Sequence, residues 1–173
     1  YKDLLKDAGP EITNFLNQNI GKDIGNFNIF NIAEMYKSAK QRPKMPYNRR
    51  AYYKVSLIRG RNKVEYAGKT LEVKQFGILF ASPKVPYYYT PLDEDQAGYF
   101  CVFTPDFMSK SNIGTDLDHL PIFSADSDFV FEISEEEYES ARGIYEKMQV
   151  ELLSDYAFKY DLLRNQLMEL IHF

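Results

Sequence analysis

The sequence has no tryptophan, one cysteine and two histidines among its 173 residues. A single cysteine cannot form an intrachain disulfide, so Cys101 favours a reducing compartment and a cytoplasmic protein. Cys101 lies in the apolar run 99–103, which predicts a buried structural thiol rather than a nucleophile. His119 stands in a polar stretch with no second set of metal ligands around it. These scarcities exclude a disulfide framework and disfavour a histidine–cysteine metal centre.

Long apolar runs and an excess of positive charge are also missing. No segment approaches about 18 uninterrupted apolar residues and no signal peptide is visible, so we expect no membrane association. The net charge of −4 disfavours nucleic-acid binding by this chain itself, because phosphate contacts require a concentrated basic face. The one basic cluster, at 42–50, is interrupted by Pro43 and Pro46 and is interpreted as a solvated approach to the first central strand.

Aromatic side chains are abundant instead, with 14 tyrosines and 13 phenylalanines. Aromatics favour strands and line ligand cavities, so this number is consistent with a β-barrel that holds a pocket, although most rings are expected to fill the core. A chain of 173 residues is long enough for one domain, or for one domain with an appendage. Because it begins without methionine and ends within a helical pattern, we expect a longer parent protein.

A central stretch, residues 47–104, shows the pattern of short strands separated by glycine and proline. Within residues 51–58, one face carries apolar side chains at alternate positions, namely Tyr53, Val55 and Leu57. The intervening Lys54 and Ser56 point the other way. Further strands are expected at 27–32, 63–67, 70–74, 78–81, 98–104 and 129–133. Regular short strands with frequent turns predict a closed or double-sheet β architecture.

Shorter segments outside these strands have different patterns. Residues 10–21 predict a helix that starts at a proline and ends at a glycine, and residues 105–110 predict a short second helix. The polar stretch 37–48, with two prolines, predicts a mobile loop over the mouth of the barrel. Residues 83–91 hold three consecutive tyrosines among three prolines, either in the pocket or along an exposed strand edge.

The last forty residues predict two helices. Ser134 and Glu137 have the spacing of a capping box, so the first helix should begin at Ser134. Its apolar residues recur at intervals of three and four, namely Tyr138, Ala141, Tyr145, Met148 and Leu152. The second helix repeats this spacing with Tyr156, Tyr160, Leu163, Leu167 and Leu170. Such stripes either cover an open face of the barrel or leave surface for a partner helix.

The spacing of turns around the central strands resembles the two motifs of the cupin double-stranded β-helix. Gly60 follows Tyr53 after six residues, and Gly77 and Pro83 precede Tyr88. The resemblance implies that four family metal positions, usually His, His, Glu and His, correspond here to Tyr47, Arg49, Tyr53 and Tyr88. Tyrosine and arginine are not ligands for a divalent metal, so we expect the scaffold without a metal or other cofactor.

Three strings extend the resemblance to a family. They are residues 53–58, residues 98–104 and residues 154–172, the last being the most specific. Together they resemble the N-terminal domain of AraC-type bacterial transcriptional regulators over roughly residues 25–173. In that family a cupin-like barrel binds a small effector, a following helix pair forms the dimer, and a C-terminal domain of two helix-turn-helix units binds DNA. That domain would need about a hundred further residues.

The expected fold is therefore mainly β with C-terminal α. Residues 1–133 would form a cupin-like jelly roll with an N-terminal helix or arm, and residues 134–173 an antiparallel helix pair for dimerisation. The resemblance implies an unknown small-molecule effector, a sugar or an anionic metabolite. Its expected contacts are Arg49, Tyr53, Val55, Leu57 and Tyr88. Tyr88 would point inward, with Tyr87 and Tyr89 pointing outward.

The regular seam on the helix pair predicts a symmetric homodimer, with DNA contacted only through the missing domain. The expected interface residues are Tyr145, Met148, Leu152, Leu163 and Leu167. The alternative is that one seam packs on the barrel and the other on the missing domain.

Two further functions remain open from the sequence. One is a metal-free cupin enzyme of the sugar isomerase or epimerase type, and the other is a ligand-free dimerisation module. Because the inward face offers Arg49 and Tyr53 but no histidine or carboxylate base, we expect binding without catalysis.

Overall fold

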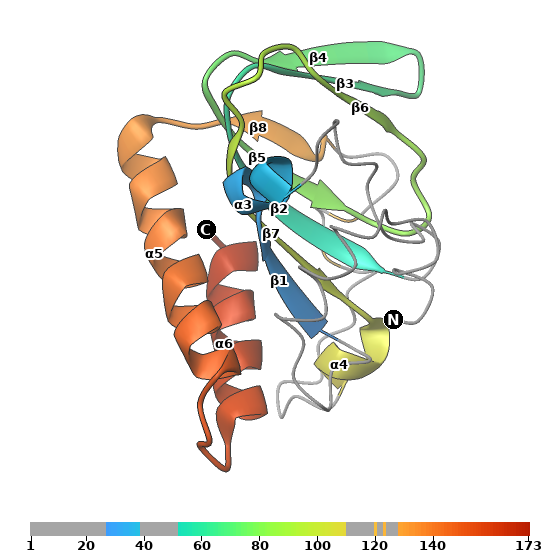
Figure 1. Cartoon of the computed structure of the whole chain (residues 1–173). Coiled ribbons are helices and arrows are strands. Elements are labelled where there is room, and N and C mark those ends of the chain that lie inside the picture. The colour runs from blue at the N-terminus through green and yellow to red at the C-terminus, as the bar shows by residue number, and fades with distance from the viewer. Residues whose placement is uncertain (1–26, 39–51, 110–119, 121–122, 124–127) are drawn as a thin grey trace.

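Two antiparallel β-sheets and a C-terminal helix pair form the described part of the chain (Figure 1). The computed structural model describes residues 27–38, 52–109, 120, 123 and 128–173. The expected helix at 10–21, most of the loop at 37–48, and His119 lie outside these residues. Within them, no helix has the length and apolar character needed to cross a membrane. The expectation of a mainly β protein with C-terminal helices is confirmed.

The larger sheet has five strands and contains most of the predicted ones. Its order is β1 (Phe27–Asn31), β7 (Ala97–Phe103), β2 (Tyr53–Arg59), β5 (Phe76–Ala81) and β8 (Val130–Glu132). Strand β2 lies at the centre, where Lys54 is paired with Val102 of β7 and with Ala81 of β5. The observed bounds differ from the predicted ones by one or two residues, which is the usual uncertainty of strand ends.

The smaller sheet has three strands in the order β4 (Lys69–Val73), β3 (Asn62–Tyr66) and β6 (Tyr88–Pro91). A two-residue turn joins β3 to β4, and both of its residues have positive φ, 48° at Ala67 and 73° at Gly68. Such a turn matches the right-handed twist of a hairpin, which explains why the strands pair without an intervening loop. Strand β6 is part of the tyrosine–proline segment, so that segment forms an edge strand.

The two sheets face each other, and contacts between their inner surfaces identify the facing sides. The Lys54 ammonium of β2 lies 5.9 Å from the centre of the Tyr89 ring of β6. Gly77 of β5 lies against Val73 of β4 so closely that a Cβ on Gly77 would stand 2.8 Å from a Val73 methyl carbon. The face of β2 that carries Lys54 and Ser56 is therefore the inner face, between the sheets.

The opposite face of the five-stranded sheet is covered by α5 (Glu135–Leu152), which contacts β1, β2, β5 and β7. The helix begins as predicted, because the Ser134 hydroxyl accepts a hydrogen bond from the Glu137 backbone N–H at 3.1 Å. The Tyr145 hydroxyl of α5 donates to the Val55 carbonyl at 2.5 Å, and its ring stacks on Tyr99 at 5.5 Å. These contacts fix the helix to the centre of the sheet.

The last helix, α6 (Lys159–Ile171), packs beside α5 and also contacts the short helix α4 (Pro105–Ser109). Arg164 of α6 donates from Nε to the Phe107 carbonyl at 2.7 Å, and its guanidinium lies 4.8 Å from the centre of the Phe107 ring. The Arg164 side chain therefore ties α4, which follows β7, to the helix pair.

Helix α3 (Ile32–Ser38) was not predicted, because the strand at 27–32 and the polar loop at 37–48 left no room for it. The Asn31 side chain explains the change from strand to helix. Its Oδ1 accepts a hydrogen bond from the Glu34 backbone N–H at 3.0 Å, which is the contact of a helix N-cap.

Candidate functional site

The inner faces of the two sheets carry buried polar side chains. Asn28, Lys54 and Ser56 belong to the inner face of the five-stranded sheet, and each is no more than 4% exposed. On β3, Asn62 is likewise buried, while its neighbour Lys63 is partly exposed on the outer face. The helix-facing side of β2 is apolar by comparison. Hydrogen-bonding groups are therefore concentrated between the sheets, where they are shielded from bulk water.

Lys54 is the most unusual of these residues, because a lysine side chain is rarely buried without compensation. Its ammonium lies 4.9 Å from the centre of the Phe100 ring and also faces Tyr89. Aromatic rings attract a cation through the negative charge of their faces, and this attraction strengthens away from water. The amino group of Lys54 therefore lies at the centre of the inner face, among aromatic rings.

Asn28 and Ser56 are placed around Lys54 by the strand register. Asn28 and Lys54 both pair with Val102, so the three residues form one row across β1, β7 and β2. Ser56 follows Lys54 by two residues on the same face. The Asn28 Oδ1 accepts a hydrogen bond from the Ile29 backbone N–H at 2.8 Å, which orients the amide. An ammonium, an amide and a hydroxyl on one surface are suited to binding a polar small molecule.

The predicted pocket residues of β2 lie on the other face, so their predicted placement on the inner face is wrong. Val55 and Leu57 are fully buried beneath the helix pair. Tyr53 stacks on Phe103 at 5.7 Å and meets the Phe123 ring edge-on at 5.0 Å, within the core. The sheet is covered on both sides, so the apolar alternation identified a buried face but not the face that looks toward the second sheet.

The predicted orientation of the three consecutive tyrosines is also wrong. Tyr88 is 77% exposed, whereas Tyr87 is buried and Tyr89 is partly buried. The register explains this, because Tyr89 pairs with the buried Val64 and Tyr88 pairs with the outward-facing Glu65. Tyr89 therefore replaces Tyr88 as the tyrosine at the inner face. Arg49 and Tyr47 lie outside the described residues.

The predicted dimer-interface residues are buried within the single chain, so this assignment also needs correction. Tyr145, Met148, Leu163 and Leu167 are fully buried, and Leu152 is 6% exposed. The seam of α5 packs on the sheet, and the seam of α6 completes the same core. Regular spacing at three and four residues reflects one helix face on a flat surface as readily as it reflects a coiled coil.

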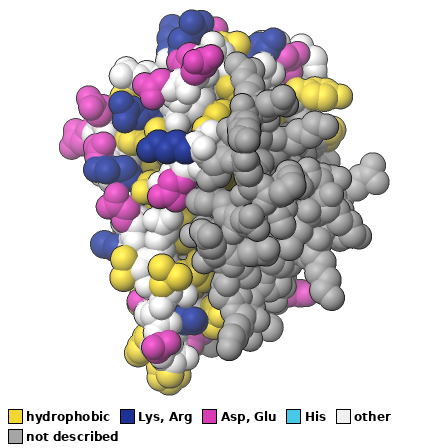
Figure 2. Space-filling model, viewed as in Figure 1, with side chains coloured by type: hydrophobic (Ala, Val, Ile, Leu, Met, Phe, Trp, Pro, Cys, Tyr) yellow, Lys and Arg dark blue, Asp and Glu magenta, His cyan; other side chains and the backbone are white. Residues whose placement is uncertain are grey.

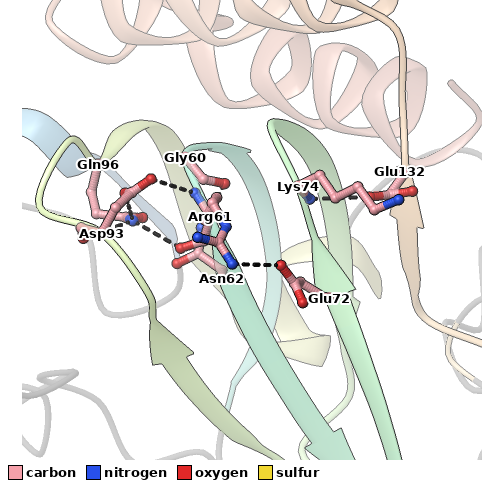
Figure 3. Close-up of polar contacts among 8 residues, drawn as sticks. All are labelled: Gly60, Arg61, Asn62, Glu72, Lys74, Asp93, Gln96 and Glu132. Carbon is pink, nitrogen blue, oxygen red and sulfur yellow. Dashed lines mark hydrogen bonds and ion pairs between the residues drawn. The ribbon is translucent and has the colours of Figure 1, made fainter.

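A second polar cluster lies at the turn between β2 and β3 (Figure 3). The Gln96 amide donates to the Asp93 carboxylate at 2.7 Å and to the Arg61 carbonyl at 3.2 Å. Arg61 in turn donates its backbone N–H to Asp93 and its guanidinium to Glu72, at 3.1 and 3.0 Å. The groups of this cluster form hydrogen bonds with one another across the turn. We therefore interpret the cluster as a structural link that holds this end of the two sheets together.

Metal-binding groups do not gather in the described part of the chain. No three histidine, cysteine, aspartate or glutamate side chains in it lie close enough to hold a metal ion. The inner-face groups that sequence reasoning missed are Asn28, Lys54 and Ser56. The polar Lys54 and Ser56 interrupt an otherwise apolar strand, and the sequence pattern placed them on the face opposite Tyr53, Val55 and Leu57.

Cys101 and Tyr145 form a buried pair on the helix-facing side, 4.0 Å apart between Sγ and the hydroxyl. Burial raises the pKa of the Cys101 thiol to about 12, and it raises the pKa of the Tyr145 hydroxyl well above its ordinary value. A thiol that stays protonated is a poor nucleophile. The expectation that Cys101 is a buried structural thiol is confirmed.

The Cys101 thiol should make the folded state sensitive to alkaline pH. The pKa of the thiol is higher in the folded protein than in an unfolded chain, where it is about 8.5. The contribution of the protonated thiol to folding stability is therefore complete below pH 8.5 and is lost as the pH rises toward 12. We expect the thiol to lower the free energy of unfolding by about 2–3 kcal/mol between pH 8 and pH 10.5. Urea unfolding at the two pH values measures this drop in the free energy of unfolding. Cys101→Ala should show a smaller loss, and equal losses in both proteins would contradict the prediction.

Comparison with known proteins identifies no relative of this chain. No protein-family model matches the chain, and the search of curated proteins finds no match.

Proposed function

We propose that this chain is the small-molecule-sensing and dimerisation domain of an AraC-type bacterial transcriptional regulator, with its effector bound between the two sheets. Two facing antiparallel sheets followed by a helix pair are compatible with the cupin-like jelly roll of that family. The single observation that carries the sensing function is the buried Lys54 on the inner face, in one row with Asn28 and beside Ser56. DNA would be bound by a further domain, in the cytoplasm.

The inner face favours an effector with a negative charge and hydroxyl groups. The Lys54 ammonium attracts a carboxylate or a phosphate, while the Asn28 amide and the Ser56 hydroxyl can donate and accept hydrogen bonds. The partly buried Tyr89 ring offers a flat surface beside the ammonium. A sugar acid or another hydroxylated anionic metabolite combines these features. The proposed role is binding without catalysis and without a cofactor.

A thermal-shift screen of anionic metabolites, sugar acids and neutral sugars tests this function. A ligand present at one hundred times its dissociation constant stabilises the folded state by about 2.7 kcal/mol, which raises the melting temperature by several degrees. We expect anionic hydroxylated compounds to give this shift and neutral sugars to give less. Substitution Lys54→Met removes the amino group, retains most of the length of the side chain and should weaken binding of the best compound by tenfold or more.

The matched control is Lys63→Met, on the outer face of β3, where Lys63 forms an ion pair with Glu65 at 3.1 Å. This variant should bind the compound as the parent protein does. Unchanged affinity in the Lys54→Met variant would contradict the proposed site. Recovery of the compound in a chemically altered form would instead favour the metal-free enzyme.

A further inference from the structure

An unpaired hydrogen-bond acceptor is buried on the three-stranded sheet. The Asn62 side chain is fully buried, and its Nδ2 donates to the Gly60 carbonyl at 3.1 Å. Its Oδ1 is one of two buried side-chain atoms in the described residues that have no hydrogen-bond partner there, the other being Oε1 of Gln166 on α6. Folded proteins pair nearly all such atoms, because an unpaired buried acceptor loses its bonds to water and gains none. The Asn62 Oδ1 can therefore accept a hydrogen bond from a bound molecule.

The strand register places Asn62 on the inner face, toward Lys54. Burial alternates along β3, with Asn62 and Val64 buried and Lys63 between them partly exposed. Val64 pairs with Tyr89, whose ring faces the amino group of Lys54. Asn62 follows on the same face, two residues or about 7 Å along β3 from Val64. The Asn62 amide and the Lys54 amino group therefore border the same space between the sheets.

A second pairing shows where this space ends. Asn62 pairs with Val73, and Val73 lies against Gly77 of the five-stranded sheet. Asn62 also follows directly on Arg61 of the polar cluster at the turn (Figure 3). Asn62 therefore marks the end of the space nearest the turn between β2 and β3, where the two sheets come close together.

We propose that Asn62 is a specificity-determining residue of the effector site. Its Oδ1 accepts a hydrogen bond from a hydroxyl at the end of the effector remote from the anionic group that Lys54 binds. The inference rests on the sensing function proposed above and adds a requirement on the ligand to it. A ligand that ends in a second carboxylate would set one acceptor against another at Asn62, so the site should select hydroxylated monoanions over dianions.

Three six-carbon acids without stereocentres test this requirement by calorimetric titration of the parent protein. Hexanoate supplies the carboxylate alone, 6-hydroxyhexanoate adds a hydroxyl at the far end, and adipate replaces that hydroxyl with a second carboxylate. We expect 6-hydroxyhexanoate to bind at least tenfold more tightly than hexanoate, because only its hydroxyl can donate to Asn62. Adipate should bind no more tightly than hexanoate.

Weak binding of the probes to surface charges has to be separated from binding at the site. Figure 2 shows lysine and arginine side chains interspersed with aspartate and glutamate side chains over the described part of the visible face. Such mixed charges attract an anion only weakly, and salt at about 0.15 M screens them further. Binding at the site is therefore the part that Lys54→Met removes.

Substitution Asn62→Leu removes the acceptor and retains a side chain of similar shape. In this variant the affinities for 6-hydroxyhexanoate and hexanoate should agree within about twofold, since the hydroxyl has lost its partner. The melting temperature without ligand should stay within a few degrees of the parent value, because an apolar side chain leaves no buried acceptor unpaired. The matched control is Asn165→Leu, at an exposed position of α6, which should keep the parent's preference for the hydroxyl.

The outcomes separate this inference from the sensing function on which it rests. Lys54-dependent binding with equal affinity for the three probes, or a preference for the hydroxyl that survives Asn62→Leu, would overturn the role of Asn62 and leave the sensing function standing. No binding of any probe, or binding that survives Lys54→Met, would overturn both. If Asn62 only held the turn at Gly60, Asn62→Leu would lower the melting temperature and the parent would show no preference. The comparison of probes in the parent needs no variant, so it decides even if Asn62→Leu does not fold.

Discussion

Substitution of Gly98 by alanine is expected to remove most of the folded stability of the protein. Gly98 has a φ of +114°, which alanine rarely adopts, and an added Cβ would stand 2.0 Å from the Leu57 carbonyl oxygen. Both obstacles are backbone features, so no side chain can move to relieve them. We expect a loss of at least about 3 kcal/mol in the free energy of unfolding, or failure to fold.

Urea unfolding followed by circular dichroism measures this loss, and a second glycine provides the control. Gly143 lies within α5, and a Cβ placed there would meet nothing within 4 Å. Gly143→Ala should therefore stabilise the protein by about 0.5–1 kcal/mol, because alanine favours the helix. A Gly98→Ala variant as stable as its parent would show that β2 and β7 do not approach each other as described.

Substitution of Met148 by glutamate is expected to unfold the protein rather than to make it monomeric. Met148 belongs to the seam of α5 and is fully buried in the core. A glutamate there would bury a charge in apolar surroundings and remove the packing of the methionine, at a cost of about 4 kcal/mol or more. If the seam of α5 were a dimer interface, the same variant would remain folded with half the mass.

Thermal unfolding and sedimentation of the Met148→Glu variant distinguish these results. Ser140 is an exposed residue of the same helix, so Ser140→Glu adds the same charge without burying it and should change stability by no more than about 0.5 kcal/mol. A folded, monomeric Met148→Glu protein would refute the packing of α5 on the sheet.

Alternation in the sequence was sufficient to find the strands but not to assign their faces. In β2, both Lys54 and Val55 are buried, because one faces the second sheet and the other faces α5. Polarity usually separates a core face from a solvent face, and β2 has no solvent face for most of its length. A buried lysine is therefore interpreted from sequence as an exposed one, and for this reason the predicted contact residues of β2 are the ones on the face covered by α5.

Pairing with a distant strand determined the orientation of the tyrosines, so local sequence could not reveal it. Tyr88 and Tyr89 differ only in their position on β6, and the register with β3 decides which one faces inward. The helix pair was predicted more successfully. Ser134 and Glu137 form a local capping contact that needs no tertiary information, whereas the surface that receives the seam of α5 is distant in sequence.

The order of the strands determines how the chain can reach this fold. Phe27 pairs with Phe103, and Leu79 pairs with Val130, so every pairing of the edge strands of the larger sheet joins segments far apart in sequence. Among the described strand pairs, only the β3–β4 hairpin forms from neighbouring residues across a two-residue turn. Closing long loops costs conformational entropy before any contact compensates for it, so we expect the chain to fold in milliseconds to seconds. The β3–β4 hairpin can form before the other strand pairs, because its strands are adjacent in the sequence.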